Sequence, residues 1–241
     1  MDIIGHRGSP TAATPENTLS SVLAAVAGGA DGVEVDVRLT ADDVAVCCHD
    51  PGLQRVAGVS RGLRALTLAQ LAGVRVQGHQ VPTVDAVASA VPEDRLLVLD
   101  LKPEHRPRRL IQAVATALDA LDAAPASIVL SATDPNILDT CARLLPELPR
   151  AVILREGEPF SRVLAMALRR GDSAVHVPLR TVFAAPELVQ VARGHGLAVR
   201  VWTVNRAVDA RLLKVLAVDA VISDVPGELR AALAPRLAVV D

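Results

Sequence analysis

The feature that most constrains the fold is a regular alternation of short apolar runs with longer amphipathic runs. After residue 95, the apolar runs predict strands at 96–101, 127–130, 151–154, 174–177, 198–203 and 220–223. Helix-like runs follow these strands at about 107–121, 135–145, 159–170, 186–194, 208–216 and 226–233. Prolines lie at or near several helix starts, where proline is favoured. This alternation predicts βαβ units and a parallel sheet.

The beginning of the chain continues the same alternation. Apolar runs predict a strand at 2–5 and another at the start of the stretch 32–50. We expect helices at 17–27 and 83–90, with Asn17 as the N-cap of the first helix. These two strands and the six later ones give eight predicted strands, which is the number typical of a barrel.

We therefore predict a single α/β domain over 1–241 with the architecture of a (β/α)8 TIM barrel. The irregular segment around 51–82, with a short helical run at 67–71, is interpreted as a short cap. A doubly wound open sheet is the alternative, although no G-x-G-x-x-G sequence follows the first strand. The run 44–49 is left over, as a hairpin partner or as an alternative barrel strand.

Composition limits the classes of partner. Hydrophobic residues make up 51% of the 241 residues but aromatic residues only 1%, and the formal net charge is −2. A nucleic-acid partner is therefore not expected, because the sequence has no basic footprint and too few aromatic side chains for base stacking. The sequence also predicts no integral membrane segment, and three cysteines without a metal-binding spacing are typical of a reducing compartment. We expect a cytoplasmic protein, and the oligomeric state does not follow from the sequence.

The stretch 32–50 places carboxylates in an otherwise apolar strand. Side chains alternate along a strand, so Glu34 and Asp36 share one face. A two-residue hairpin turn at Asp42-Asp43 would pair Asp36 with His49 on the neighbouring strand, whereas an extended return would not. Two adjacent carboxylates repel each other, and a divalent cation would relieve that repulsion.

Other reactive side chains lie at the carboxyl ends of the predicted strands, where barrel enzymes carry their active sites. They are His6, Arg7, Glu34, Asp36, His49, Asp50, Asp100, Lys102, Trp202 and Asn205. Together, two histidines, an arginine, a lysine and several carboxylates at corresponding strand ends indicate an active site. His176 is a further candidate for the pocket wall, whereas Cys47 and Cys48 are interpreted as buried packing residues.

The combination resembles the glycerophosphodiester phosphodiesterase family from residue 5 to about residue 228. The motifs that carry the resemblance are His6-Arg7-Gly8, Pro15-Glu16-Asn17-Thr18, Glu34-x-Asp36, His49-Asp50, Asp100-x-Lys102 and Trp202-Thr203-Val204-Asn205. The resemblance implies a (β/α)8 barrel that hydrolyses small-molecule glycerophosphodiesters to glycerol 3-phosphate and an alcohol, with one divalent cation, Mg²⁺ or Ca²⁺.

The resemblance also assigns roles by matching positions. It implies His6 and His49 as the general acid/base pair, Glu34, Asp36 and Asp100 as metal ligands, and Arg7 and Lys102 as phosphate contacts. Trp202 is interpreted as an apolar platform for the glycerol carbons or as a core residue. Which histidine is the base, and whether water or a glycerol hydroxyl attacks the phosphorus, stay open.

The chain departs from the family pattern in two informative places. Asp100 stands where glutamate is usual, and its shorter side chain predicts a shifted or weaker metal site. The segment 51–82 is short, so we expect a more open site. Two alternatives therefore remain, a non-catalytic phosphate-binding barrel and a phosphodiesterase acting on lysolipid phosphodiesters.

Overall fold

The computed structural model describes residues 1–121 and 127–234. These residues form nine strands: β1 (Asp2–His6), β2 (Gly32–Leu39), β3 (Ala45–Cys47), β4 (Leu96–Leu101), β5 (Ser127–Ala132), β6 (Arg150–Ile153), β7 (Ala174–Pro178), β8 (Ala198–Trp202) and β9 (Ala220–Ser223). Eight of them pair in parallel in the order β1-β9-β8-β7-β6-β5-β4-β2, and β1 also pairs with β2, which closes the ring. The predicted (β/α)8 TIM barrel is confirmed.

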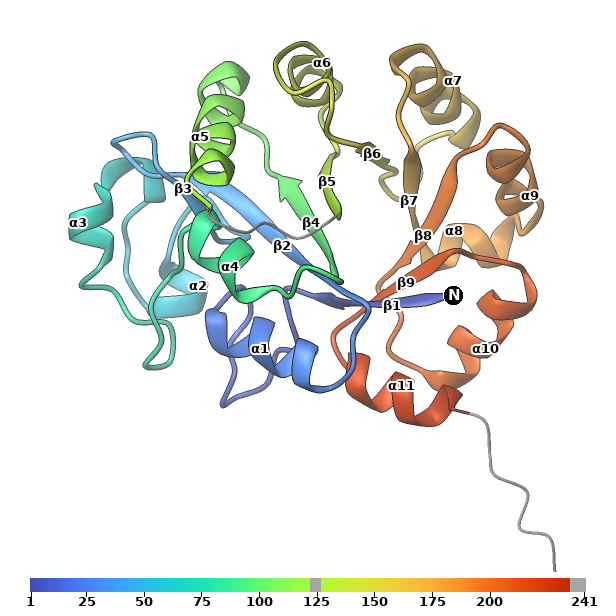
Figure 1. The fold of residues 1–241 in the computed structure, drawn as a ribbon, viewed down its shortest axis with the longest axis horizontal. Helices are drawn as coiled ribbons and strands as arrows, with labels where there is room; N and C mark the ends of the chain where they lie inside the picture. Colours follow the sequence, from blue (N-terminus) through green and yellow to red (C-terminus); the bar gives the residue numbers. More distant parts are fainter. Residues whose placement is uncertain (122–126, 235–241) are drawn as a thin grey trace, which may run out of the picture.

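Helices surround this ring (Figure 1). They are α1 (Leu19–Ala27), α2 (Gln54–Ala57), α3 (Leu68–Leu71), α4 (Val84–Ala90), α5 (Pro107–Asp119), α6 (Pro135–Leu144), α7 (Phe160–Arg170), α8 (Leu179–Ala184), α9 (Glu187–Gly194), α10 (Ala207–Val215) and α11 (Pro226–Leu233), with a 3-10 helix, η1 (Leu63–Ala65). The helices α2, η1 and α8 were not predicted, because each is short and lies between stronger patterns. No helix in the described ranges is long and apolar enough to cross a membrane.

The core lies mainly between the strands and the helices. Along β2, the valines Val33, Val35 and Val37 are fully buried against the helical layer. The residues between them point into the barrel, where Glu34 and Asp36 replace apolar side chains. This alternation explains how one strand contributes both to packing and to a polar interior.

The first helix begins one residue later than expected. The Thr18 side chain accepts a hydrogen bond from the Ser21 amide and caps α1, so the prediction of Asn17 as N-cap is wrong. Asn17 instead has a left-handed backbone, with φ of 58°. Its side chain binds both the backbone and the carboxylate of Asp36, as described below.

Strands β2 and β3 form a hairpin, which decides between the two alternatives for the run 44–49, but the two-residue turn that would pair Asp36 with His49 is not formed. Val37 pairs with Cys47 and Leu39 with Ala45. The Thr40 amide donates to the Val44 carbonyl at 3.0 Å, which leaves three loop residues rather than two. Asp43 in this loop adopts a φ of 58°, as is common in three-residue hairpin loops.

The Cys48 amide accordingly donates to the Asp36 carbonyl at 2.9 Å. Asp36 therefore does not pair with His49, which lies just beyond the hairpin. Cys47 and Cys48 are both buried, as predicted.

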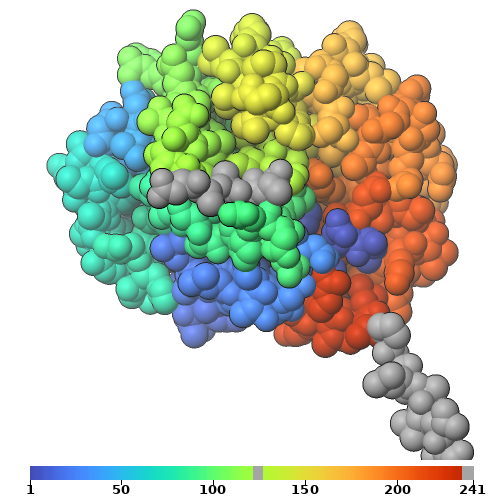
Figure 2. Space-filling view, viewed as in Figure 1, coloured from blue at the N-terminus to red at the C-terminus, as the bar shows by residue number. Residues whose placement is uncertain are grey.

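The predicted cap has its own small apolar cluster. Val46, Leu53, Leu63, Leu66 and Leu71 are buried together there. In the space-filling view, this part of the chain forms the lobe at the left edge (Figure 2). The cap thus attaches to the barrel beside β3, next to the segment that carries His49.

Candidate active site

One cavity of about 220 Å³ collects the predicted site residues at the carboxyl ends of the strands. It is lined by His6, Arg7, Glu34, Asp36, His49, Asp100, Lys102, Ser131, Thr133, Ile153, His176, Trp202 and Ile222. All eight residues predicted for catalysis, substrate binding or metal binding are in this set. His176, a further candidate in the sequence, is there as well.

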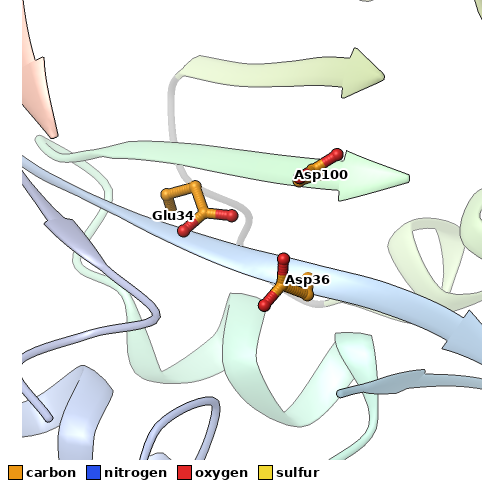
Figure 3. Close-up of side chains that lie close together, drawn as sticks. All are labelled: Glu34, Asp36 and Asp100. Carbon is orange, nitrogen blue, oxygen red and sulfur yellow. The ribbon is translucent and has the colours of Figure 1, made fainter. Parts of the chain in front are cut away.

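Three carboxylates form the centre of the charged wall. Glu34 and Asp36 lie two residues apart on β2, and Asp100 lies directly beside Asp36 on β4 (Figure 3). One oxygen from each of the three comes within 4.8 Å of the others. Carboxylate oxygens in this arrangement suit a hard divalent cation such as Mg²⁺ or Ca²⁺. Asp100 thus reaches the cluster despite being shorter than the glutamate that is usual there.

Two cations lie against these carboxylates. Lys102 Nζ lies 2.5 Å from an oxygen of Asp36 and 2.5 Å from an oxygen of Asp100. Arg7 Nε lies 3.0 Å from Asp36 Oδ2, and the Arg7 amide donates to Glu34 at 3.0 Å. Burial alone would raise the pKa of Asp36, but Lys102 and Arg7 outweigh it and hold the pKa below its usual value.

Glu34 is less well neutralised. Its burial and the negative charge of Asp36 raise the pKa of Glu34 to about 7. Burial also raises the pKa of Asp100, although Lys102 opposes the effect. The protein side chains alone therefore leave excess negative potential at this point, which is the electrostatic condition that a bound divalent cation would relieve.

Asn17 and Gly8 hold the first loop against this cluster. Asn17 Nδ2 donates to Asp36 Oδ2 at 2.7 Å, and the Asp36 amide donates to Asn17 Oδ1 at 2.9 Å. Gly8 has a φ of 88°, and a Cβ there would lie 2.4 Å from the backbone of Ser21. A glycine is therefore required after His6-Arg7, because the loop passes too close to α1 for a side chain.

Both predicted catalytic histidines bind an aspartate. His6 Nδ1 lies 2.6 Å from Asp224 Oδ1, and Asn205 donates to the other oxygen of Asp224 at 2.7 Å. Because a carboxylate accepts, the proton between the two residues belongs to Nδ1, and Nε2 is left for the cavity. Burial opposes protonation of His6, but the Asp224 hydrogen bond and the charge of Glu34 outweigh it and raise the pKa of His6.

The second pair is built differently. His49 Nδ1 lies 2.7 Å from Asp50 Oδ1, and Arg55 from the cap binds Asp50 Oδ2 at 2.6 Å. Arg55 also donates to both oxygens of Glu16, which in turn accepts from Arg7. Salt bridges thus connect the cap to the first loop and to His49.

The sequence predicts no individual role for Asp224, Asn205 or Asp50, and for Asn17 it predicts only an N-cap. Asn205, Asp50 and Asn17 nevertheless lie in the motifs that carry the family resemblance. Arg55 lay in the predicted cap without a role. Adjacency of His49 and Asp50 in the chain was a usable signal, since a carboxylate next to a histidine can orient its ring. The contact of His6 with Asp224 spans almost the whole chain and becomes visible only when β1 pairs with β9.

Comparisons with known proteins identify the family. The sequence model of the Glycerophosphoryl diester phosphodiesterase family matches residues 6–228. The chain belongs to this family, which consists of phosphoric diester hydrolases. It is 31% identical over 253 residues to the probable glycerophosphodiester phosphodiesterase 1 of Mycobacterium tuberculosis, covering 95% of this chain and 91% of the relative.

Two further relatives agree. The glycerophosphodiester phosphodiesterase of Caldanaerobacter subterraneus is 26% identical over 243 residues, covering 94% of this chain and 95% of the relative. The structure of an Oleispira antarctica phosphodiesterase in complex with the product sn-glycerol-3-phosphate superimposes with a TM-score of 0.88 at 25% identity. That similarity covers 98% of this chain and 97% of the other.

Proposed function

We propose that the protein hydrolyses glycerophosphodiesters to glycerol 3-phosphate and an alcohol. The observation that carries this proposal is that His6 and His49, each bound to an aspartate, line one cavity together with Lys102, Arg7 and three carboxylates. A non-catalytic barrel would have no need for two oriented imidazoles. The similarity to the Oleispira antarctica phosphodiesterase, which binds sn-glycerol-3-phosphate, supports the choice of substrate.

The proposal includes one divalent cation held by Glu34, Asp36 and Asp100. The donor set fits, because all three side chains are buried or nearly so and offer oxygen ligands, and because burial and the charge of Asp36 raise the pKa of Glu34, which a bound cation would relieve. When bound, the cation supplies Lewis-acid stabilisation of charge on a phosphoryl oxygen. Mg²⁺ and Ca²⁺ both suit these ligands.

The charged side chains of the protein share the remaining work. Arg7 and Lys102 place positive charge where the phosphate would bind, and a bound phosphate would compete with Asp36 for both. His6 and His49 act as general acid and base through Nε2, because Asp224 and Asp50 hold each Nδ1. Trp202, at the end of β8, offers an apolar face to the glycerol carbons.

The test is release of glycerol 3-phosphate from glycerophosphocholine or glycerophosphoethanolamine by the purified protein. We expect turnover with Mg²⁺ or Ca²⁺, loss of turnover with EDTA, and recovery when the cation is restored. His6→Ala should lower kcat by about 10³-fold, since it removes one proton-transfer group. Binding of glycerol 3-phosphate in calorimetry without any hydrolysis would instead support the non-catalytic barrel.

A further inference from the structure

The inner face of the barrel carries a second polar pair, on β7 and β8. His176 and Arg200 lie opposite each other in the parallel register of these strands. Their chain neighbours Val175, Val177 and Val199 are fully buried in the core between strands and helices. Because side chains alternate along a strand, His176 and Arg200 both face the inside of the barrel.

Their contact fixes the protonation pattern of the imidazole. Arg200 Nη1 lies 3.2 Å from His176 Nε2. A guanidinium only donates hydrogen bonds, so Nε2 accepts and the ring proton lies on Nδ1. Burial, followed by the charge of Arg200, lowers the pKa of His176 well below its usual value. The ring is therefore a neutral donor with a defined tautomer.

In the part of the chain that the structure describes, the His176 ring contacts Arg200 through Nε2, so the Nδ1–H group is left to donate to an acceptor in the cavity that the residue lines. The residue lines the active-site cavity and is only 2% exposed, which places it deep in the barrel rather than at the mouth. A donor this deep in the cavity needs an acceptor from a bound molecule or from water.

The position of His176 indicates which part of the substrate that acceptor belongs to. In the ring of eight strands, β7 lies four strands from β2 in either direction, so His176 is on the wall opposite Glu34 and Asp36. The charged residues of the cavity come from β1, β2, β4 and the loops that follow the first strands. The cavity residue that pairs with His176 across β6 and β7 is Ile153, which is uncharged, and Trp202 on the neighbouring strand β8 is uncharged as well.

A phosphate bound at the charged wall would direct the uncharged part of the molecule toward His176. A neutral N–H backed by a guanidinium suits a hydroxyl oxygen and disfavours an ammonium group. We propose that His176 donates a hydrogen bond to the terminal hydroxyl of the glycerol moiety, and that Arg200 is a positioning residue that fixes the required tautomer. This inference rests on the proposed function and names the specificity determinant of the same site.

The test compares two substrates that differ in one hydroxyl, the p-nitrophenyl phosphodiesters of glycerol and of propane-1,2-diol. Both retain the hydroxyl nearest the phosphate and the same leaving group. We expect the wild-type protein to prefer the glycerol diester by about ten-fold in kcat/KM, which is the value of one hydrogen bond to a substrate hydroxyl. His176→Leu should abolish this preference.

His195→Leu is the matched control, because His195 is exposed in the turn after α9. It should keep the wild-type preference, and thermal unfolding shows whether each variant folds. The inference would be overturned if His176→Leu lowered kcat/KM equally for both diesters, or if the wild-type protein did not prefer the glycerol diester. The proposed function would stand in either case. A wild-type protein that hydrolyses neither diester would overturn both.

The role of Arg200 is tested by nitrogen NMR of the imidazole. In the wild-type protein, the His176 signals, assigned from their absence in His176→Leu, should show Nδ1 protonated and Nε2 unprotonated. Arg200→Met should change this pattern and reduce the preference for the glycerol diester. If the tautomer and the preference both survive in a folded Arg200→Met protein, Arg200 is not a positioning residue.

Discussion

The two histidine–aspartate pairs of the active site have different surroundings. Asp224 lies where β9 ends beside β1, and Asn205 holds its second oxygen, so the His6 pair is built from the barrel itself. Asp50 lies beyond β3, and its second oxygen binds Arg55 of the cap. The His6 side chain is 19% exposed, whereas those of His49 and Arg55 are 39% and 49% exposed.

This difference indicates how each ring is kept in place. Backbone pairing and a neutral amide position the His6 pair, and neither depends on salt. The His49 pair depends on ionic contacts between loops that are close to solvent, where screening and side-chain entropy weaken such contacts. We therefore expect changes at the first pair to have larger effects than changes at the second.

The largest expected effect is that of Asp224→Asn. An amide can present its NH₂ group to Nδ1 and so favour the wrong tautomer, and it no longer stabilises the protonated ring. We expect kcat for glycerophosphocholine to fall by about 10²- to 10³-fold, with a smaller change in KM. Steady-state kinetics at saturating cation measures both constants.

Asp94→Asn is the control for the same chemical change, since that side chain is 73% exposed and pairs only with Arg95 among the described residues. It should retain wild-type kinetics. If Asp224→Asn kept more than about a third of wild-type kcat, the proposed role of the His6 pair would be wrong.

The sequence predicts the side-chain pattern of β2 but not the register of the hairpin that follows it. The valine and carboxylate alternation of β2 predicted both the barrel strand and the shared face of Glu34 and Asp36, because period-two patterns translate directly into geometry. The register of the following hairpin did not follow, since it depends on Asp43 adopting a left-handed backbone. One extra loop residue was enough to replace His49 by Cys48 opposite Asp36.

The contacts of the two pairs were predictable to different degrees. Asp50 follows His49 in the chain, so its proximity was given by the sequence. The partner of His6 is 218 residues away, and the contact of Arg55 with Glu16 joins two irregular segments. Contacts of this kind follow from tertiary packing, for which no local pattern exists. The cap was predicted as a segment, but its connection to the active site was not.

An intermediate effect is expected for Arg55→Met, which breaks the connection between the cap and the His49 pair. Asp50 and Glu16 lose a shared partner, and the His49 ring gains freedom without losing its own chemistry. We expect kcat to fall by about ten-fold, because small misplacement of a proton-transfer group is costly. Arg61→Met is the control in the same cap segment: among the described residues the Arg61 side chain donates to the Ala65 carbonyl, and its loss should leave kcat unchanged. An Arg55→Met protein with wild-type kcat would show that the cap does not position His49.

The smallest expected effect is on stability in acid. The hydrogen bond from Arg55 is the main cause that lowers the pKa of Asp50 from 3.8 to about 2. A carboxyl group whose pKa is lower in the folded state stabilises the fold when the pH is above its pKa in the unfolded chain. For Asp50, this contribution is lost as the pH falls from about 4 to about 2. Because Arg55 and Asp50 are partly exposed, we expect this contribution to the free energy of unfolding to be about 1 kcal/mol or less.

Urea unfolding measures this contribution. The free energies of unfolding of the wild type and Arg55→Met should differ at pH 7 and converge toward pH 2. A difference that stayed constant or grew on acidification would show that Arg55 stabilises the fold by packing rather than through its charge on Asp50.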